Sequence, residues 1–156
     1  MIDLPRVTII VLNWNGRDDT LACLSSLSEL DYPSYEIVVV DNGSGDDSVE
    51  AIRASFPRVT LVETGENLGY VGGNNLGLEY ARAAKADYAL LLNNDTEVAP
   101  DFVHMLVDAA QAGPDIGIAG PVAGLLVAIP ATLIYNALVR RVDVLTARWN
   151  SLQHQS

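Results

Sequence analysis

The polar segment Asn93-Asn94-Asp95 stands directly after an uninterrupted apolar run, Leu90–Leu92. Such a run is typical of a buried parallel strand, and open α/β sheets bind their ligands at the carboxyl ends of these strands. The carboxylate of Asp95 is a hard oxygen ligand for a divalent cation, and the two amides can hydrogen-bond a sugar hydroxyl or a phosphate. The alternative is a strand-to-helix turn in which Asp95 or Thr96 caps the following helix.

Three more polar segments follow apolar runs, at Asn13–Gly16, at Asp41 and in the glycine- and asparagine-rich loop of residues 67–75. In a parallel sheet these segments share one edge with the end of the Leu90–Leu92 run. A ligand there would meet an aromatic ring, carboxylates, and backbone N–H groups that glycine leaves accessible. This combination suits a nucleotide.

A bound nucleotide would give several of these side chains a role. Trp14 could stack on the base, and Asp41 could accept a hydrogen bond from a base N–H. Asn94 could hold a ribose hydroxyl, and Asp95 could hold Mg²⁺ or Mn²⁺ bridging a diphosphate. From the residues alone, a packing role for Trp14 and a turn role for Asp41 stay open as alternatives.

The elements that would position these residues alternate along the chain. Aliphatic and β-branched runs predict buried strands, and amphipathic stretches predict helices. Their β-α-β-α-β-α-β order predicts an α/β fold with a mostly parallel, Rossmann-like sheet and helices on both faces. The predicted strands are residues 7–12, 36–41, 59–62 and 88–92; the predicted helices are residues 18–30, a helix capped by Ser44 or Asp46 and ending near 56, a helix following the 67–75 loop and ending near 86, and residues 100–112.

The first predicted helix carries leucines three residues apart, which predict its buried face. Cys23, the one cysteine of the chain, lies among them. Because it has no partner for a disulfide or a zinc site, we expect it to pack in the core. The leucines of this face are Leu21, Leu24, Leu27 and Leu30.

The charge of the chain is distributed unevenly. Of the net charge of −11, residues 1–120 carry 6 basic and 19 acidic side chains, and residues 121–156 carry 3 basic and 1 acidic. The acidic part argues against binding of nucleic acid, which needs a basic surface. The start of the chain lacks the basic residues and apolar core of a signal peptide, so we expect a cytoplasmic protein.

Four segments of the chain together resemble the N-terminal half of a family 2 glycosyltransferase of GT-A fold, especially its rhamnosyltransferase-like members. The likeness covers about residues 5–120, and the four segments stand in the order and spacing of the family. The segments are Thr8–Gly16, Ile37–Ser44, Glu66–Tyr70 and Leu90–Val98.

This resemblance implies a site for a nucleotide-diphosphate sugar, with Asn93-Asn94-Asp95 in place of the family's Asp-x-Asp motif. It implies Asp95 as the ligand of Mg²⁺ or Mn²⁺, although two amides stand where many relatives have carboxylates. It also implies transfer of the sugar to an acceptor hydroxyl. The residues expected to bind the nucleotide sugar are Asn13, Trp14, Asn15, Asp41, Asn67, Gly69, Gly73, Asn93 and Asn94.

The chain departs from the family after Gly120, where relatives carry the acceptor surface and the catalytic base. No catalytic base is therefore predicted, since none of Asp101, Asp108 and Asp115 has the right context. On this ground we expect a truncated donor half with little or no sugar transfer. The alternative function is a nucleotide-sugar-binding module without turnover.

The tail differs in character from the body, so the predicted domains are residues 1–120 and 121–156. Residues 121–139 are uncharged and precede Arg140-Arg141, which predicts an apolar helix. It would either associate with a membrane, at the inner face of the cytoplasmic membrane, or cover sheet surface. Residues 124–136 resemble the last membrane helix of ExbB/TolQ-type proton-channel subunits, which makes a membrane-anchored interaction protein a third functional class. Two truncated resemblances that meet here indicate a fusion, a frameshift or an assembly artefact.

Overall fold

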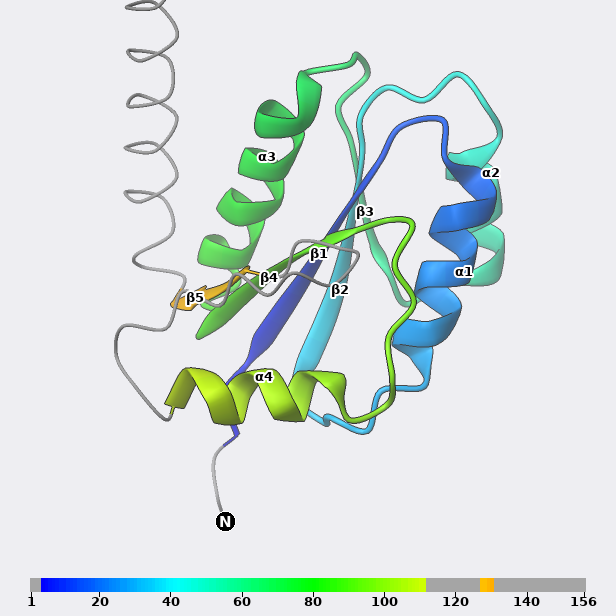
Figure 1. The fold of residues 1–156 in the computed structure, drawn as a ribbon. Helices are drawn as coiled ribbons and strands as arrows, with labels where there is room; N and C mark the ends of the chain where they lie inside the picture. The colour runs from blue at the N-terminus through cyan, green and yellow to red at the C-terminus, as the bar shows by residue number, and fades with distance from the viewer. Residues whose placement is uncertain (1–3, 112–126, 131–156) are drawn as a thin grey trace, which may run out of the picture.

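Alternating aliphatic strands and amphipathic helices build one sheet covered by helices (Figure 1). The computed structural model describes residues 4–111 and 127–130. The elements are β1 (Val7–Asn13), α1 (Arg17–Ser28), β2 (Tyr35–Asp41), α2 (Ser48–Ser55), β3 (Thr60–Glu63), α3 (Gly69–Ala83), β4 (Tyr88–Asn93), α4 (Phe102–Gln111) and β5 (Val127–Pro130).

The strands lie in the order β3-β2-β1-β4-β5, and the first four of these are parallel. This arrangement confirms the predicted parallel α/β sheet. The register aligns the strand ends, because Asn13 pairs with Asp41 and Leu12 pairs with Asn93. The polar residues predicted to form a site therefore start from neighbouring backbone positions at one edge of the sheet.

Side chains of β1 alternate between two apolar layers. Ile9 and Val11 pack into a cluster with residues of α1 and α4, whereas Ile10 packs with residues of α3. All three are fully buried, and each face of the strand has its own helical cover (Figure 1). Helices on both faces are thus confirmed.

The buried face of α1 is displaced from the predicted one. Leu24 and Leu27 are buried as expected, but Leu21 and Leu30 are only half-buried. The face instead runs along Thr20, Cys23, Leu24 and Leu27, at the three- and four-residue spacing of a helix that turns its side against β1. Cys23 is fully buried in the core, as predicted.

The expected loop of residues 67–75 is helical from Gly69 onward. The sequence favours a loop there because glycine and asparagine are weak helix formers. The structure explains the glycines by packing: a Cβ on Gly73 would overlap Leu12, and a Cβ on Gly77 would overlap Ile10. Close approach of α3 to β1 therefore overrides local propensity.

Most of the predicted apolar helix of residues 121–139, with its likeness to a membrane helix, lies outside the described residues. Within it, Val127–Pro130 forms a short strand antiparallel to β4, which corrects the helix prediction at these four positions. The open edge of β4 offers backbone hydrogen bonds to an extended segment, and Pro130, which has no N–H, is tolerated in an edge strand. In residues 4–111 and 127–130, no helix has both the length and the apolar character needed to cross a membrane.

Candidate functional site

The carboxyl edge of the parallel strands gathers the predicted site residues. Helices α1, α2 and α3 each begin within seven residues of the end of the strand before them, so their N-termini lie at this edge. Helix N-termini present free backbone N–H groups and favour anions. An acidic chain can therefore bind a phosphate here without a basic surface.

Asn13 is the fully buried centre of this edge. Its Nδ2 donates to Asp41 Oδ1 at 2.8 Å and to Ser44 Oγ at 3.1 Å. Its Oδ1 accepts from the Gly16 N–H at 3.2 Å and from Thr20 Oγ1 at 2.8 Å. Every hydrogen-bonding position of the amide is used. Asn13 thus organises the site from within, and its side chain has no free position for a ligand.

Asp41 ends β2 with its carboxylate held in place by three donors. Oδ1 accepts from Asn13 Nδ2 and from Ser44 Oγ at 2.6 Å, and Oδ2 accepts from the Ser44 N–H at 3.0 Å. A carboxylate offers about four lone-pair sites, so Oδ2 keeps acceptor capacity. Asp41 is only 3% exposed, which limits contact with a ligand to a small edge of the residue.

Asn42 ties the end of β2 to the start of α3, a role the sequence reasoning missed. Its Nδ2 donates to Asn67 Oδ1 and to the Gly69 carbonyl, and its Oδ1 accepts from the Leu68 N–H. Asn67 Oδ1 also accepts from the Gly69 N–H at 2.8 Å. Gly69 has φ +73°, a conformation that favours glycine. Asn67 and Gly69 therefore shape the entry to α3, while Gly73 lies within α3 and is buried against Leu12.

Trp14 and Asn15 form the loop after β1. The Trp14 side chain is 57% exposed, so it does not take the packing role and its ring is accessible to a ligand. Asn15 lies in the left-handed region with φ +52°. Its Oδ1 accepts from the Gly45 N–H at 2.7 Å, and its N–H donates to Ser44 Oγ at 2.9 Å. Asn15 thus joins the loops after β1 and β2.

The segment after β4 turns at Asn93, whose carbonyl accepts from the Thr96 N–H at 3.2 Å. Neither Asp95 nor Thr96 caps a helix, because α4 begins only at Phe102. Asn94 reaches across to α1, where its Nδ2 donates to Thr20 Oγ1 at 3.0 Å. The capping alternative is therefore wrong, and the turn presents Asp95 to solvent.

Two exposed carboxylates, Asp95 and Glu97, make this turn electronegative. Burial, and to a smaller extent the charges of Asp95 and Glu97, raise the pKa of the Cys23 thiol to about 12. Among the described residues, no three His, Cys, Asp or Glu side chains gather as a metal site. Mg²⁺ and Mn²⁺ commonly bind one or two carboxylates together with substrate phosphates and water, so the residues present fit such an ion bound with a diphosphate.

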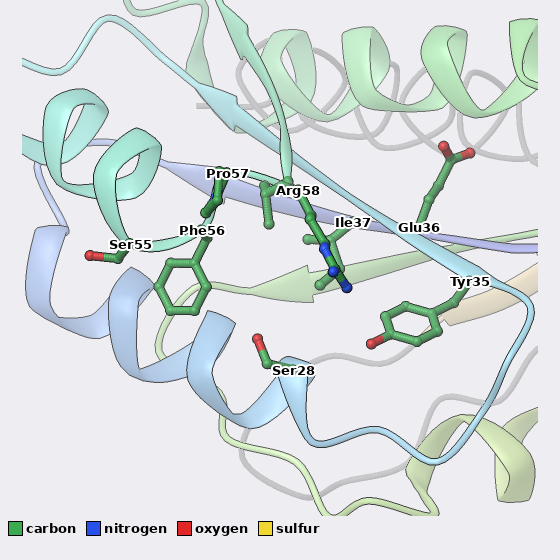
Figure 2. A pocket seen from close by; sticks show the side chains of 9 residues that line it. Ser28, Tyr35, Glu36, Ile37, Ser55, Phe56, Pro57 and Arg58 are labelled. Carbon is green, nitrogen blue, oxygen red and sulfur yellow. The ribbon is translucent and has the colours of Figure 1, made fainter.

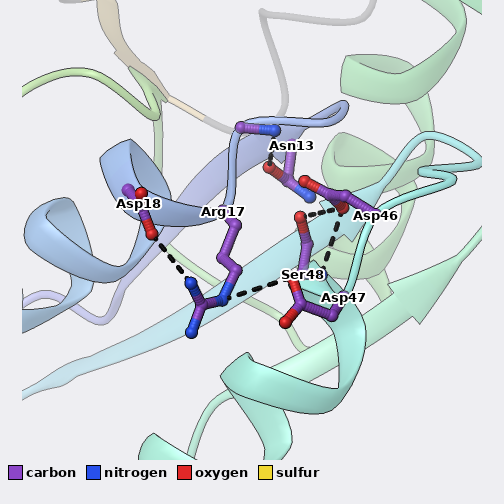
Figure 3. Close-up of polar contacts among 7 residues, drawn as sticks. Asn13, Arg17, Asp18, Asp46, Asp47 and Ser48 are labelled. Carbon is purple, nitrogen blue, oxygen red and sulfur yellow. Dashed lines mark hydrogen bonds and ion pairs between the residues drawn. The ribbon is translucent and has the colours of Figure 1, made fainter.

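An ion pair between Arg17 and Asp47 joins the starts of α1 and α2 (Figure 3). Arg17 lies between Asp18, at 3.1 Å, and Asp47, at 3.3 Å. Asp46 accepts from the N–H and the hydroxyl of Ser48 at the start of α2, and the hydroxyl bond lowers the pKa of the Asp46 carboxyl. The N-cap of α2 is Asp47, with no side-chain capping bond, so the prediction that Ser44 or Asp46 caps this helix is wrong. Ser44 bonds Asp41 instead.

A cavity of about 490 Å³ lies at the opposite end of the sheet, where β2 begins (Figure 2). Arg58, Phe56, Tyr35 and Glu36 are among the residues that line it, and in Figure 2 the Glu36 side chain points away from the other three. Glu36 accepts from Thr8 Oγ1 at 2.8 Å on the other face of the sheet. None of the predicted site residues lines this cavity.

Sequence reasoning missed Thr20, which links Asn13 to Asn94. A signal was present, because Thr20 is a polar residue at helical spacing from Cys23, Leu24 and Leu27. It also missed Gly16, where a Cβ would overlap Asn94 Nδ2. Both residues belong to α1 or its N-cap and could be recognised only once β4 was placed beside β1.

The fold and this edge define an open parallel α/β protein of GT-A-like architecture, a class that binds ligands where its strands end. A mannosyltransferase from Pyrobaculum calidifontis, solved in complex with GDP-Man and Mn²⁺, matches with TM-score 0.62 and 32% identity over 74% of this chain and 35% of that one. Staphylococcus aureus TarS in complex with UDP-GlcNAc matches with TM-score 0.59 and 20% identity over 69% and 31%, which supports the fold alone.

The family profile "Glycosyl transferase family 2" matches residues 8–125, and the chain belongs to this family. An N-acetylglucosaminyl-diphospho-decaprenol L-rhamnosyltransferase of Mycobacterium tuberculosis is 33% identical over 106 residues, which are 63% of this chain and 34% of the relative. The succinoglycan biosynthesis protein ExoO of Rhizobium meliloti is 30% identical over 110 residues, 70% and 31% of the two chains. The chain spans about one third of the length of the curated relatives it matches.

Proposed function

We propose that this chain binds a nucleotide-diphosphate sugar at the carboxyl edge of its sheet and forms the donor side of a family 2 glycosyltransferase. The observation that carries the proposal is the Asp41 carboxylate, held by Asn13 and Ser44 with acceptor capacity left on Oδ2. A base N–H is the matching donor. The exposed ring of Trp14 lies one residue beyond Asn13 and offers a stacking surface.

The sugar diphosphate would extend from the base toward the turn after β4. Asp95, with phosphate oxygens and water, would hold Mg²⁺ or Mn²⁺ there, and a bound ion would stabilise the negative charge of the departing diphosphate. Asn93 and Asn94 add amide groups that recognise ribose or sugar hydroxyls without repelling the diphosphate. The Pyrobaculum mannosyltransferase was solved with GDP-Man and Mn²⁺ together, which supports this choice of ligands.

Transfer would form a bond between an acceptor oxygen and the anomeric carbon, break the bond from that carbon to the diphosphate, and pass the acceptor proton to a base. Among the described residues, the site offers donor-binding groups, and none is assigned as that base. Donor binding is therefore the part of the function to test first in this chain.

The test is isothermal titration calorimetry of the whole chain with UDP-GlcNAc, GDP-mannose and dTDP-rhamnose, each with and without Mn²⁺. We expect one donor to bind, with binding strengthened by Mn²⁺. Asp41→Ala should remove the contact to the base, and Asp95→Ala should remove only the Mn²⁺-dependent part. Arg58→Ala, in the cavity at the other end of the sheet, is the matched control and should bind like wild type. Absence of binding by all three donors would refute the proposal.

A further inference from the structure

A chain of hydrogen bonds runs from Asp41 through Asn13 and Thr20 to Asn94. In each bond, the structure determines which atom donates and which accepts. The Gly16 backbone N–H can only donate, and it points to Asn13 Oδ1 at 3.2 Å. The oxygen of the Asn13 amide therefore faces α1, and its Nδ2 faces the Asp41 carboxylate, which can only accept. Both ends of the Asn13 side chain are thus assigned by groups whose roles are unambiguous.

Thr20 carries this direction one step further. Its hydroxyl is fully buried and lies 2.8 Å from Asn13 Oδ1, an acceptor, so its one proton is donated there. The hydroxyl then has only lone pairs to offer to Asn94, and the Asn94 atom 3.0 Å away must be Nδ2. Space for this contact comes from Gly16, where any Cβ would overlap Asn94 Nδ2.

This assignment leaves the oxygen of the Asn94 amide, Oδ1, available to a ligand. With Nδ2 committed to Thr20, Oδ1 is turned away from α1 and accepts no hydrogen bond from the residues that the structure describes. An acceptor oxygen beside Asp95 suits a sugar or ribose hydroxyl or a divalent cation. A flipped amide would present N–H donors at the same place and would repel a cation.

We propose that Thr20 is a positioning residue that orients the Asn94 amide so that its oxygen faces the bound nucleotide sugar. This inference rests on the proposed donor site and adds to it a residue that touches no ligand. Thr20 also joins the two halves of the site, because the chain Asp41–Asn13–Thr20–Asn94 runs from the end of β2 to the end of β4.

The test compares Thr20→Val, which removes the hydroxyl and keeps the shape, with Thr20→Ser, which keeps the hydroxyl. The readout is the dissociation constant of whichever donor binds wild type most tightly among UDP-GlcNAc, GDP-mannose and dTDP-rhamnose, with Mn²⁺. Loss of one hydrogen bond predicts about 5- to 10-fold weaker binding for Thr20→Val, and Thr20→Ser should stay within about twofold of wild type.

A double-mutant cycle separates positioning from general loosening of the fold. If Thr20 acts through Asn94, Thr20→Val combined with Asn94→Ala should bind no more weakly than Asn94→Ala alone. Independent, multiplying losses in the double variant, or wild-type affinity in Thr20→Val, would overturn the inference and leave the proposed donor site standing. Failure of wild type to bind any of the three donors would overturn both.

A measurement on the wild-type chain keeps the inference testable if Thr20→Val does not fold. In side-chain amide NMR, one Asn94 proton should exchange slowly with solvent, because it is donated to Thr20. The protection should persist when donor and Mn²⁺ are added. Rapid and equal exchange of both Asn94 protons, or loss of protection on binding, would overturn the proposed orientation.

Discussion

The pairing of Asn13 with Asp41 predicts a variant whose stability depends on pH. Asn13→Asp keeps the shape of the side chain but replaces the Nδ2 donor with an oxygen 2.8 Å from Asp41 Oδ1. Two charges at that distance would repel by about 6 kcal/mol at an effective dielectric constant of about 20. Retaining one proton between the two carboxyls avoids this repulsion and restores a donor, so the folded variant should bind a proton that the wild type does not.

The free energy needed to protonate the carboxyl determines how much stability the variant loses. For a carboxyl with an unfolded pKa of about 3.9, protonation costs about 1.4 kcal/mol for each pH unit above that value, or about 4 kcal/mol at pH 7 and about 1 kcal/mol at pH 4.5. The folded state holds more protons than the unfolded state, so the variant loses stability as pH rises above about 4. Asn13→Asp should therefore be destabilised at pH 7 and recover most of the difference at pH 4.5.

Urea unfolding of wild type and variant at both pH values measures this difference. The matched control is Asn13→Asp combined with Asp41→Asn, which exchanges the donor and the acceptor and keeps one charge in the pair. We expect the exchanged pair to recover stability at pH 7, because one donor again faces one acceptor. A constant difference between Asn13→Asp and wild type at the two pH values would refute the assignment, as would an exchanged pair no more stable than Asn13→Asp.

Two further predictions concern the layers under the site. Gly77→Ala should destabilise the fold by about 1–3 kcal/mol in urea unfolding, because its Cβ would overlap Ile10 Cγ2, a branched methyl that cannot turn away. Gly73→Ala, which meets the flexible end of Leu12, should cost less, and equal effects at the two glycines would contradict this packing. Cys23, fully buried and with its pKa raised to about 12 first by burial, should react with a thiol reagent at pH 8 only when the protein unfolds. Rapid labelling of the folded chain would contradict the tight packing of α1 against the sheet.

The pattern of apolar and polar residues along the chain was sufficient to predict the architecture. The aliphatic runs before Asn13, Asp41 and Asn93 predict strands, and their alternation with helices predicts a parallel sheet whose polar ends share an edge. That inference needs only the period of the side chains and the handedness of the crossovers. The inference failed in α3, where glycines are needed because the helix lies close to β1. Helix propensity depends on local sequence and carries no information about the distance to a neighbouring strand.

The roles within the site needed the tertiary structure. The sequence treats Asn13 and Asn94 alike, as amides after strands, whereas the fold buries Asn13 with all its hydrogen-bonding positions used and leaves an oxygen of Asn94 without a partner among the described residues. Thr20 entered no motif, since its partners are 7 and 74 residues away along the chain. Residue types and their order thus determined the fold and the chemistry at its edge; which side chains support the site and which meet a ligand was decided by burial and hydrogen-bond direction, which exist only after distant segments have packed together.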